Sequence, residues 1–218
     1  LADAWPTPLA ASAKTAKGIG LLWRIARNGA AMYGRKLTAA EVQRRIDRWY
    51  RPYHAALAAE LDAMHRSFGA IWHINCHSMP AVGDAYSDDA GRPRKDFVLG
   101  DRDGTTCAPE FTALVADTLT GLGYSVAIND PYKGVEIVRR YGRPEERRHS
   151  LQIELNRRLY MDETTLERND GYAKLEANLE RLLAAVAGYV RARIQSPLLR
   201  SRVDSDRVTA RPDTRRSS

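Results

Sequence analysis

Hydrophobic and polar residues follow two different periodicities along the chain, and each periodicity predicts a different kind of element. Apolar residues recur at helical spacing in three stretches, which predicts helices over 38–68, 110–122 and 169–194. Thr38 and Glu41 have the spacing of a capping box at the start of the first helix. Pro52 is expected to kink or break that helix near Arg51, because proline lacks a backbone N–H and clashes with the preceding turn.

Short runs of apolar and β-branched residues predict the strands. They are expected at 18–25, 70–74, 124–129, 136–141 and 150–156. The last run alternates strictly, with Leu151, Ile153 and Leu155 on one face and polar residues on the other. The stretch 81–100 is polar and rich in Gly, Pro and Asp, so it is expected to form a long loop. Strands that alternate with helices predict an α/β fold.

Length, composition and charge narrow the class of protein. The chain has 218 residues, 44% hydrophobic and 28% charged, which is typical of a globular protein, and we expect one domain over 1–195. No apolar run approaches the roughly 20 residues that cross a bilayer, so no membrane partner is expected. The formal net charge is +7. Segment 196–218 has six Arg, three Asp and no aromatic residue, and we expect it to be a basic, disordered tail.

Two further observations concern the cell compartment and the partners. Cys76 and Cys107 are too few for a disulfide framework, and their spacing matches no metal motif. A reduced, cytoplasmic setting is the expectation, although the sequence leaves a bridge between the two thiols open. The chain has neither a recognised nucleic-acid-binding motif nor a face that mixes aromatic and basic residues. Nucleic acid is therefore not an expected partner.

Candidate catalytic and metal-binding residues lie at or near three predicted strand ends. His77 and Ser78 follow the strand at 70–74, Asn129 follows the next strand, and Glu154 lies on the last. Open α/β sheets place their sites where loops leave the strand ends, so neighbouring strands would bring these groups to one crevice. A histidine can hold a metal ion, and a carboxylate on an adjacent strand can act as general base. Structural roles, a hydrogen-bonded histidine and a salt-bridged glutamate, fit the same residues.

Several segments, taken in order, resemble the N-formylglutamate amidohydrolase family. The matching segments are Gly18–Trp23, Pro52–His54, Cys76–Pro80, Val98–Asp101 with Gly104, Asn129–Gly134, Tyr141–Gly142, His149–Arg157 and Leu159–Met161. The run Gln-Ile-Glu-Leu-Asn-Arg, residues 152–157, is the most specific of them.

This resemblance implies a three-layer α/β/α fold with a mixed, mostly parallel sheet like that of metallocarboxypeptidases. It also implies zinc-dependent hydrolysis of a small anionic acyl-amino acid, N-formyl-L-glutamate, to formate and L-glutamate. By position, His77 would be a zinc ligand and Glu154 the general base. The implied contacts to the substrate carboxylates are Asn129, Tyr132, Lys133, Arg139 and Arg157.

The resemblance leaves the metal site incomplete. The family usually has Asp at the position of Asn75, and a carboxylate orients an imidazole better than an amide does. Such enzymes bind zinc through three protein ligands. Residues 1–72 offer only His54 and His65, both in predicted helices, and residue 1 is Leu. We therefore expect the other ligands upstream of this chain, and weak zinc binding by the chain alone.

Two alternatives stay open on the sequence. The same zinc site could act on another acylated amino acid or on a peptide. The chain could instead be a non-catalytic or truncated relative that is kept as a binding domain.

Overall fold

The computed structural model describes residues 1–8, 12–26, 29–85 and 87–194. The chain forms two compact units, which are described separately. The first unit comprises Leu1–Glu60 with Val82–Arg92, and the second comprises Leu61–Ala81 with Pro93–Ser218. The single domain expected over 1–195 stays a prediction, and the basic tail at 196–218 lies outside the described residues.

The main regular elements of the first unit are helices. It contains α1 (Ala13–Ala16), α2 (Ala39–Arg45) and the beginning of α3 (Arg51–Phe68). The predicted capping box is confirmed, because the Glu41 backbone N–H donates to Thr38 Oγ1 and the Thr38 backbone N–H donates to the Glu41 carboxylate. The strand predicted at 18–25 is wrong for the described residues, in which only isolated bridges such as Ile19 to Trp23 occur.

Pro52 does not stop the predicted first helix. Residues Ile46–Tyr50 form a π-helical turn, and α3 begins directly after it at Arg51. A widened turn ahead of Pro52 gives room for the proline ring and removes the need for its missing N–H. The helix then continues to Phe68, where Gly69, at φ +67°, ends it as predicted.

The second unit is built on a mixed four-stranded sheet. Its strands are β1 (Ile71–Met79), β2 (Phe97–Gly100), β3 (Val126–Ile128) and β4 (Arg148–Asn156). The strand order is β1-β4-β2-β3. β1 runs parallel to β4 and β2 runs parallel to β3, whereas β2 and β4 are antiparallel. The predicted α/β class with a mixed, mostly parallel sheet is therefore confirmed.

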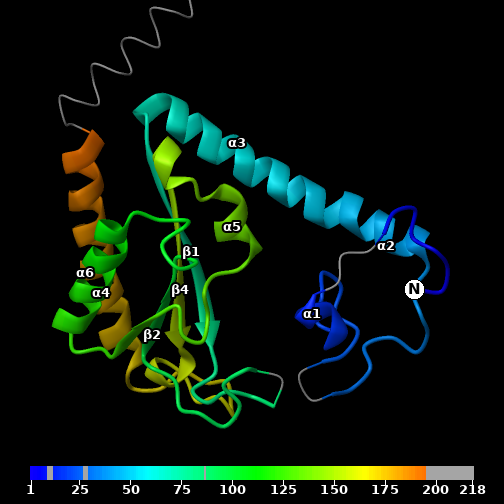
Figure 1. Ribbon diagram of the computed structural model, residues 1–218. Helices are drawn as coiled ribbons and strands as arrows, with labels where there is room; N and C mark the ends of the chain where they lie inside the picture. The colour runs from blue at the N-terminus through cyan, green and yellow to red at the C-terminus, as the bar shows by residue number, and fades with distance from the viewer. Residues whose placement is uncertain (9–11, 27–28, 86, 195–218) are drawn as a thin grey trace, which may run out of the picture. The chain divides into compact units, whose positions relative to one another are not determined.

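Helices cover both faces of this sheet (Figure 1). On one face lie α4 (Pro109–Gly121) and α6 (Tyr172–Ile194), which close the main core. This core contains Phe97, Leu99, Phe111, Val115, Leu119, Leu151, Ile153, Leu175, Leu182 and Val186. On the other face, the short helix α5 (Glu136–Tyr141) packs against β4. Single 3-10 turns at Pro144–Glu146 and Arg157–Leu159 flank β4.

Two further predictions differ from the structure. Residues 136–141 form the helix α5 rather than a strand, with Val138 and Tyr141 buried one helical turn apart. The predicted loop at 81–100 ends in β2, a central strand in which all four residues are buried. A strand that is covered on both faces shows no polar alternation, so its pattern cannot be distinguished from a short apolar end of a loop.

Two further differences bear on the site. β1 extends to Met79, so His77 and Ser78 lie inside the strand rather than in a loop behind it. The polar face of β4 is buried, with Gln152 and Asn156 fully covered. Among the described residues, no helix has the length and apolar character that a membrane crossing requires.

Candidate active site

The candidate site lies on the polar face that β1 and β4 share. The two parallel strands pair His73 with Ser150, Asn75 with Gln152, and His77 with Glu154. Alternate side chains of a strand point to the same face, so these pairs form two adjoining columns of polar groups. At the end of the columns nearest the N-termini of the two strands, His73 Nδ1 lies 2.8 Å from Ser150 Oγ.

His77 and Glu154 lie at the end of the columns nearest the C-termini of the two strands. His77 Nδ1 is 4.0 Å from Glu154 Oε1. The side chain of His77 is 38% exposed, whereas that of Glu154 is 8% exposed. The imidazole is therefore partly exposed to solvent, and the carboxylate beside it is largely buried.

Glu154 is a carboxylate in a partly desolvated position. Burial raises its pKa above the ordinary value for glutamate. The nearby His77, a hydrogen bond from Gln152, and the guanidinium groups of Arg94 and Arg157 oppose this rise. A carboxyl group held in this balance can both accept and return a proton, which is what general acid–base catalysis requires.

Gln152 holds the carboxylate in place. Its Nε2 donates to Glu154 Oε1 over 2.8 Å, and its Oε1 accepts from the Val135 backbone N–H over 2.9 Å. Asn75 Nδ2 donates to the same Gln152 oxygen over 3.4 Å and lies 3.0 Å from His77 Nε2. The two amides thus connect both candidate chemical groups to the backbone at the start of α5.

Two arginines accompany Glu154. Arg94 is 4% exposed, and its guanidinium carbon lies 5.0 Å from the centre of the Tyr132 ring. Arg157 Nε donates to Ser78 Oγ over 3.2 Å, and Arg157 Nη1 lies 4.0 Å from the Glu163 carboxylate. Of the substrate contacts implied by sequence, Arg157 is therefore close enough to Glu154 to lower its pKa, and Tyr132 contacts Arg94, which has the same effect.

The other three implied contacts have different surroundings. Asn129 lies at φ +60°, and its side chain makes two hydrogen bonds with Asp101, to the backbone N–H and to the carboxylate. Lys133 Nζ lies 2.8 Å from the Asp103 carboxylate. Arg139, on α5, pairs with Glu136 over 2.7 Å. Their roles toward a substrate stay predictions.

The described residues do not fit a zinc ion by themselves. They contain no group of three or more His, Cys, Asp or Glu side chains arranged to hold a metal. His54, in the first unit, packs against Tyr50 and Tyr53, and His65 Nε2 lies 3.0 Å from the Glu146 carbonyl oxygen. This leaves His77 as one imidazole beside one carboxylate, whereas a catalytic zinc site uses three protein ligands.

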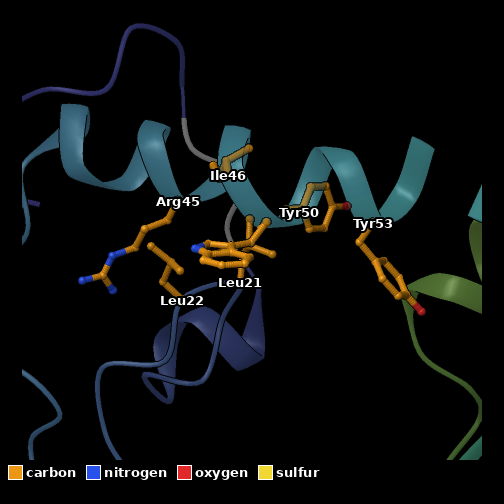
Figure 2. Close-up of a pocket in the computed structure, with 7 residues that line it drawn as sticks. Leu21, Leu22, Arg45, Ile46, Tyr50 and Tyr53 are labelled. Carbon is orange, nitrogen blue, oxygen red and sulfur yellow. The ribbon is translucent and has the colours of Figure 1, made fainter. Parts of the chain in front are cut away.

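The first unit carries an open groove of about 500 Å³ (Figure 2). Its lining residues are Leu21, Leu22, Arg45, Ile46, Trp49, Tyr50 and Tyr53. The groove lies between the loop that carries Leu21 and Leu22 and the helical segment that carries Ile46 and Tyr50 (Figure 2). It has no carboxylate or imidazole in its lining, so it offers no acid–base pair for chemistry.

Sequence reasoning did not find Arg94 and Gln152 as members of the site. Gln152 gave a usable signal, because it shares the polar face of β4 with Glu154 and precedes it by two residues. Arg94 gave none, since it lies in a polar stretch in which Arg92 and Lys95 are also basic. Only the fold reveals that this arginine is the buried one.

Comparisons with known proteins agree with this architecture. The crystal structure of N-formylglutamate amidohydrolase from Ralstonia eutropha JMP134 superposes with a TM-score of 0.79 and 51% identity, covering 87% of this chain and 68% of that one. N-formylglutamate deformylase of Pseudomonas putida is 33% identical over 71% of this chain and 58% of its own length. The Pseudomonas aeruginosa enzyme of the same name is 36% identical over 58% and 47%, respectively.

This chain therefore spans about half the length of the curated relatives that it matches. The sequence profile of the family described as N-formylglutamate amidohydrolase matches residues 3–161, which is most of the chain. On that match, and on the shared fold of the solved relative, the chain belongs to the N-formylglutamate amidohydrolase family.

Proposed function

We propose that this chain hydrolyses the amide bond of N-formyl-L-glutamate, releasing formate and L-glutamate. The names of its relatives support the reaction. The observation that carries the proposal is the position of Glu154, a buried carboxylate with a raised pKa, beside an exposed imidazole and two arginines.

In the proposed reaction, Glu154 acts as the general base. Its carboxylate takes a proton from a water molecule as the water oxygen bonds to the formyl carbon. The carboxylic acid formed in this way returns the proton to the amide nitrogen as the C–N bond breaks. One water is consumed, and the products are formic acid and the amine, which leave as formate and the protonated amine once the acid proton has passed to the amine.

Charge complementarity supports the choice of substrate class. N-formylglutamate carries two carboxylates, and Arg157, whose side chain is 35% exposed, is placed to bind one of them. Guanidinium groups bind carboxylates through paired hydrogen bonds. Arg94 is 4% exposed and lies over the Tyr132 ring, so its positive charge acts on the site from a buried position.

The zinc ion implied by the family resemblance stays a prediction. His77 would be one ligand, and the remaining ligands would come from outside the described residues. Because a single imidazole is too little to hold zinc, purified chain is expected to contain much less than one zinc per molecule by metal analysis. Tight, stoichiometric zinc would contradict this expectation.

The proposal is tested by measuring formate release from N-formyl-L-glutamate, with Zn²⁺ supplied. Glu154→Gln keeps the size of the side chain but cannot accept the proton, so we expect at least about a 100-fold loss of kcat. Glu176→Gln, on the exposed face of α6, is the matched control and is expected to keep wild-type activity. Full activity in Glu154→Gln would exclude the general-base role.

The same assay separates the proposed enzyme from its alternatives. Release of product from other N-acyl amino acids, with N-formyl-L-glutamate left intact, would assign the site to a different acyl substrate. Calorimetric binding of N-formyl-L-glutamate without any turnover would identify the chain as a binding domain.

A further inference from the structure

A chain of hydrogen bonds runs from the backbone at the start of α5 to the imidazole of His77. It begins at the Val135 backbone N–H, which donates to Gln152 Oε1 over 2.9 Å. A backbone N–H can only donate, so the oxygen end of the Gln152 amide must face it. Because Gln152 is fully buried and its Nε2 donates to Glu154, neither end of this amide is free to turn.

The orientation of Gln152 fixes that of Asn75. Asn75 Nδ2 lies 3.4 Å from Gln152 Oε1 and 3.0 Å from His77 Nε2. If the Asn75 amide were turned over, its oxygen would face the Gln152 oxygen, and two acceptors would meet without a proton between them. The network of donors and acceptors therefore assigns the amino group of Asn75 to the side that faces the ring.

The orientation of Asn75 in turn decides where the ring of His77 carries its proton. An amino group donates, so His77 Nε2 accepts and carries no proton. A neutral imidazole has one N–H, which then lies on Nδ1, the nitrogen 4.0 Å from Glu154 Oε1. We propose that Gln152 and Asn75 are positioning residues, which hold neutral His77 as the Nδ1–H tautomer with its proton directed toward Glu154.

This assignment gives His77 a definite function in the site. The ring presents a donor, rather than a lone pair, to the space beside the Glu154 carboxylate. It can hydrogen-bond a carbonyl oxygen or a developing oxyanion there, in the manner of an oxyanion-hole side chain. A metal ligand needs a lone pair, whereas Nδ1 holds the proton and the Nε2 lone pair accepts from Asn75. Zinc binding by His77, the role that the family resemblance implies, would therefore require Asn75 to turn away from Nε2 or the proton to leave Nδ1.

The tautomer is measured by long-range ¹H–¹⁵N correlation spectra of the histidine rings in ¹⁵N-labelled chain. The spectra are recorded at about pH 8.5, where an ordinary imidazole is neutral. His77→Gln identifies the His77 signals by their loss. We expect wild-type His77 to show the Nδ1–H pattern as the dominant form, and a dominant Nε2–H pattern would overturn the proposal.

Variants then test which residues set the tautomer. Asn75→Asp replaces the donor with an acceptor of the same shape, so we expect the His77 proton to move to Nε2. Gln152→Met removes the fixed partner of Asn75, so we expect a mixture of both tautomers. Ser150→Ala is the matched control, because it removes a polar neighbour of His73 in the same column and should leave His77 unchanged.

An unchanged Nδ1–H pattern in folded Asn75→Asp would overturn the role of Asn75. Circular dichroism establishes folding, and Asn75→Asp carries the test if Gln152→Met does not fold. The proposed tautomer rests on the site of the proposed function, but the spectra measure it without any turnover. A chain with the Nδ1–H tautomer that released no formate would contradict the proposed function alone.

Discussion

At the scale of single residues, the two cysteines lie in different environments. Cys107 is fully buried in the core, and burial raises the pKa of its thiol to about 12. Cys76 lies exposed on the edge strand β1, although partial burial also raises its pKa. Both thiols are free, so the disulfide that the sequence left open is excluded in this structure.

These environments predict selective labelling by a thiol reagent. The thiolate is the reactive form, and it must also be accessible, so we expect Cys76 to react in the native chain and Cys107 only after unfolding in urea. The number of modified thiols, counted by mass spectrometry, checks this. Cys76→Ser should remain unlabelled under native conditions, and rapid labelling of that variant would show that Cys107 is accessible.

Glu154 illustrates which residue properties a sequence can reveal. Strict alternation in β4 predicted its face correctly, because side chains of a strand point to alternate sides. Alternation did not reveal that this polar face is covered, since the covering helix α5 lies in a stretch that reads as a strand. The raised pKa of Glu154 depends on that cover, so it could not be predicted from the sequence.

At the scale of elements, β2 and the turn after β3 fit together through two glycines. A Cβ atom at Gly100 would lie 2.6 Å from the Gly134 backbone nitrogen and 2.8 Å from the Lys133 carbonyl carbon. These are backbone atoms, which cannot move aside as a flexible side chain does. Gly134 itself lies at φ +104°, a conformation that side chains disfavour.

Gly100→Ala is therefore expected to destabilise the second unit by about 1–3 kcal/mol, the range for overpacking of a closed core. It should also displace the segment that carries Tyr132 and the Val135 N–H, and so reduce activity. Urea denaturation measures the stability change. Gly121→Ala is the matched control, because no atom lies within 4 Å of its added Cβ, and we expect little change. Equal stability of both variants would show that the turn adapts freely.

The long elements were predictable from the sequence, and the short ones were not. α4 and α6 bury several residues at helical spacing, so their periodic pattern is unambiguous. β2 and α5 have four and six residues, too few for a period to emerge. Their conformations are decided by what packs on them, which is information that a local pattern does not contain.

At the scale of the whole sheet, the site depends on strand order. The last strand in the sequence, β4, lies between β1 and β2, and this insertion brings Glu154 beside His77. Sequence reasoning gave the polar strand ends but only assumed that the strands were neighbours. Strand order depends on pairing between segments far apart in the sequence, so only the assembled fold could establish it.

The stability of the assembled fold is expected to fall as the pH falls below about 6.5, the ordinary pKa of histidine. Burial lowers the pKa of His73 and of His149 in the folded chain. Between the lowered pKa and the ordinary one, the unfolded chain binds more protons than the folded chain, so acid favours unfolding. The raised pKa of Glu154 acts in the opposite direction, since protonation relieves the cost of its buried charge.

A comparison with His149→Gln isolates the contribution of one histidine. His149 stacks on Trp72, and its Nδ1 accepts from the Ala108 backbone N–H over 3.2 Å. Glutamine keeps an acceptor but does not titrate, so the variant should lose less stability than the wild type between about pH 7.5 and 5. Urea midpoints at both pH values give the two losses. Equal losses would mean that His149 protonates as readily in the folded chain as in the unfolded one, and the burial of its ring would then have no consequence for acid unfolding.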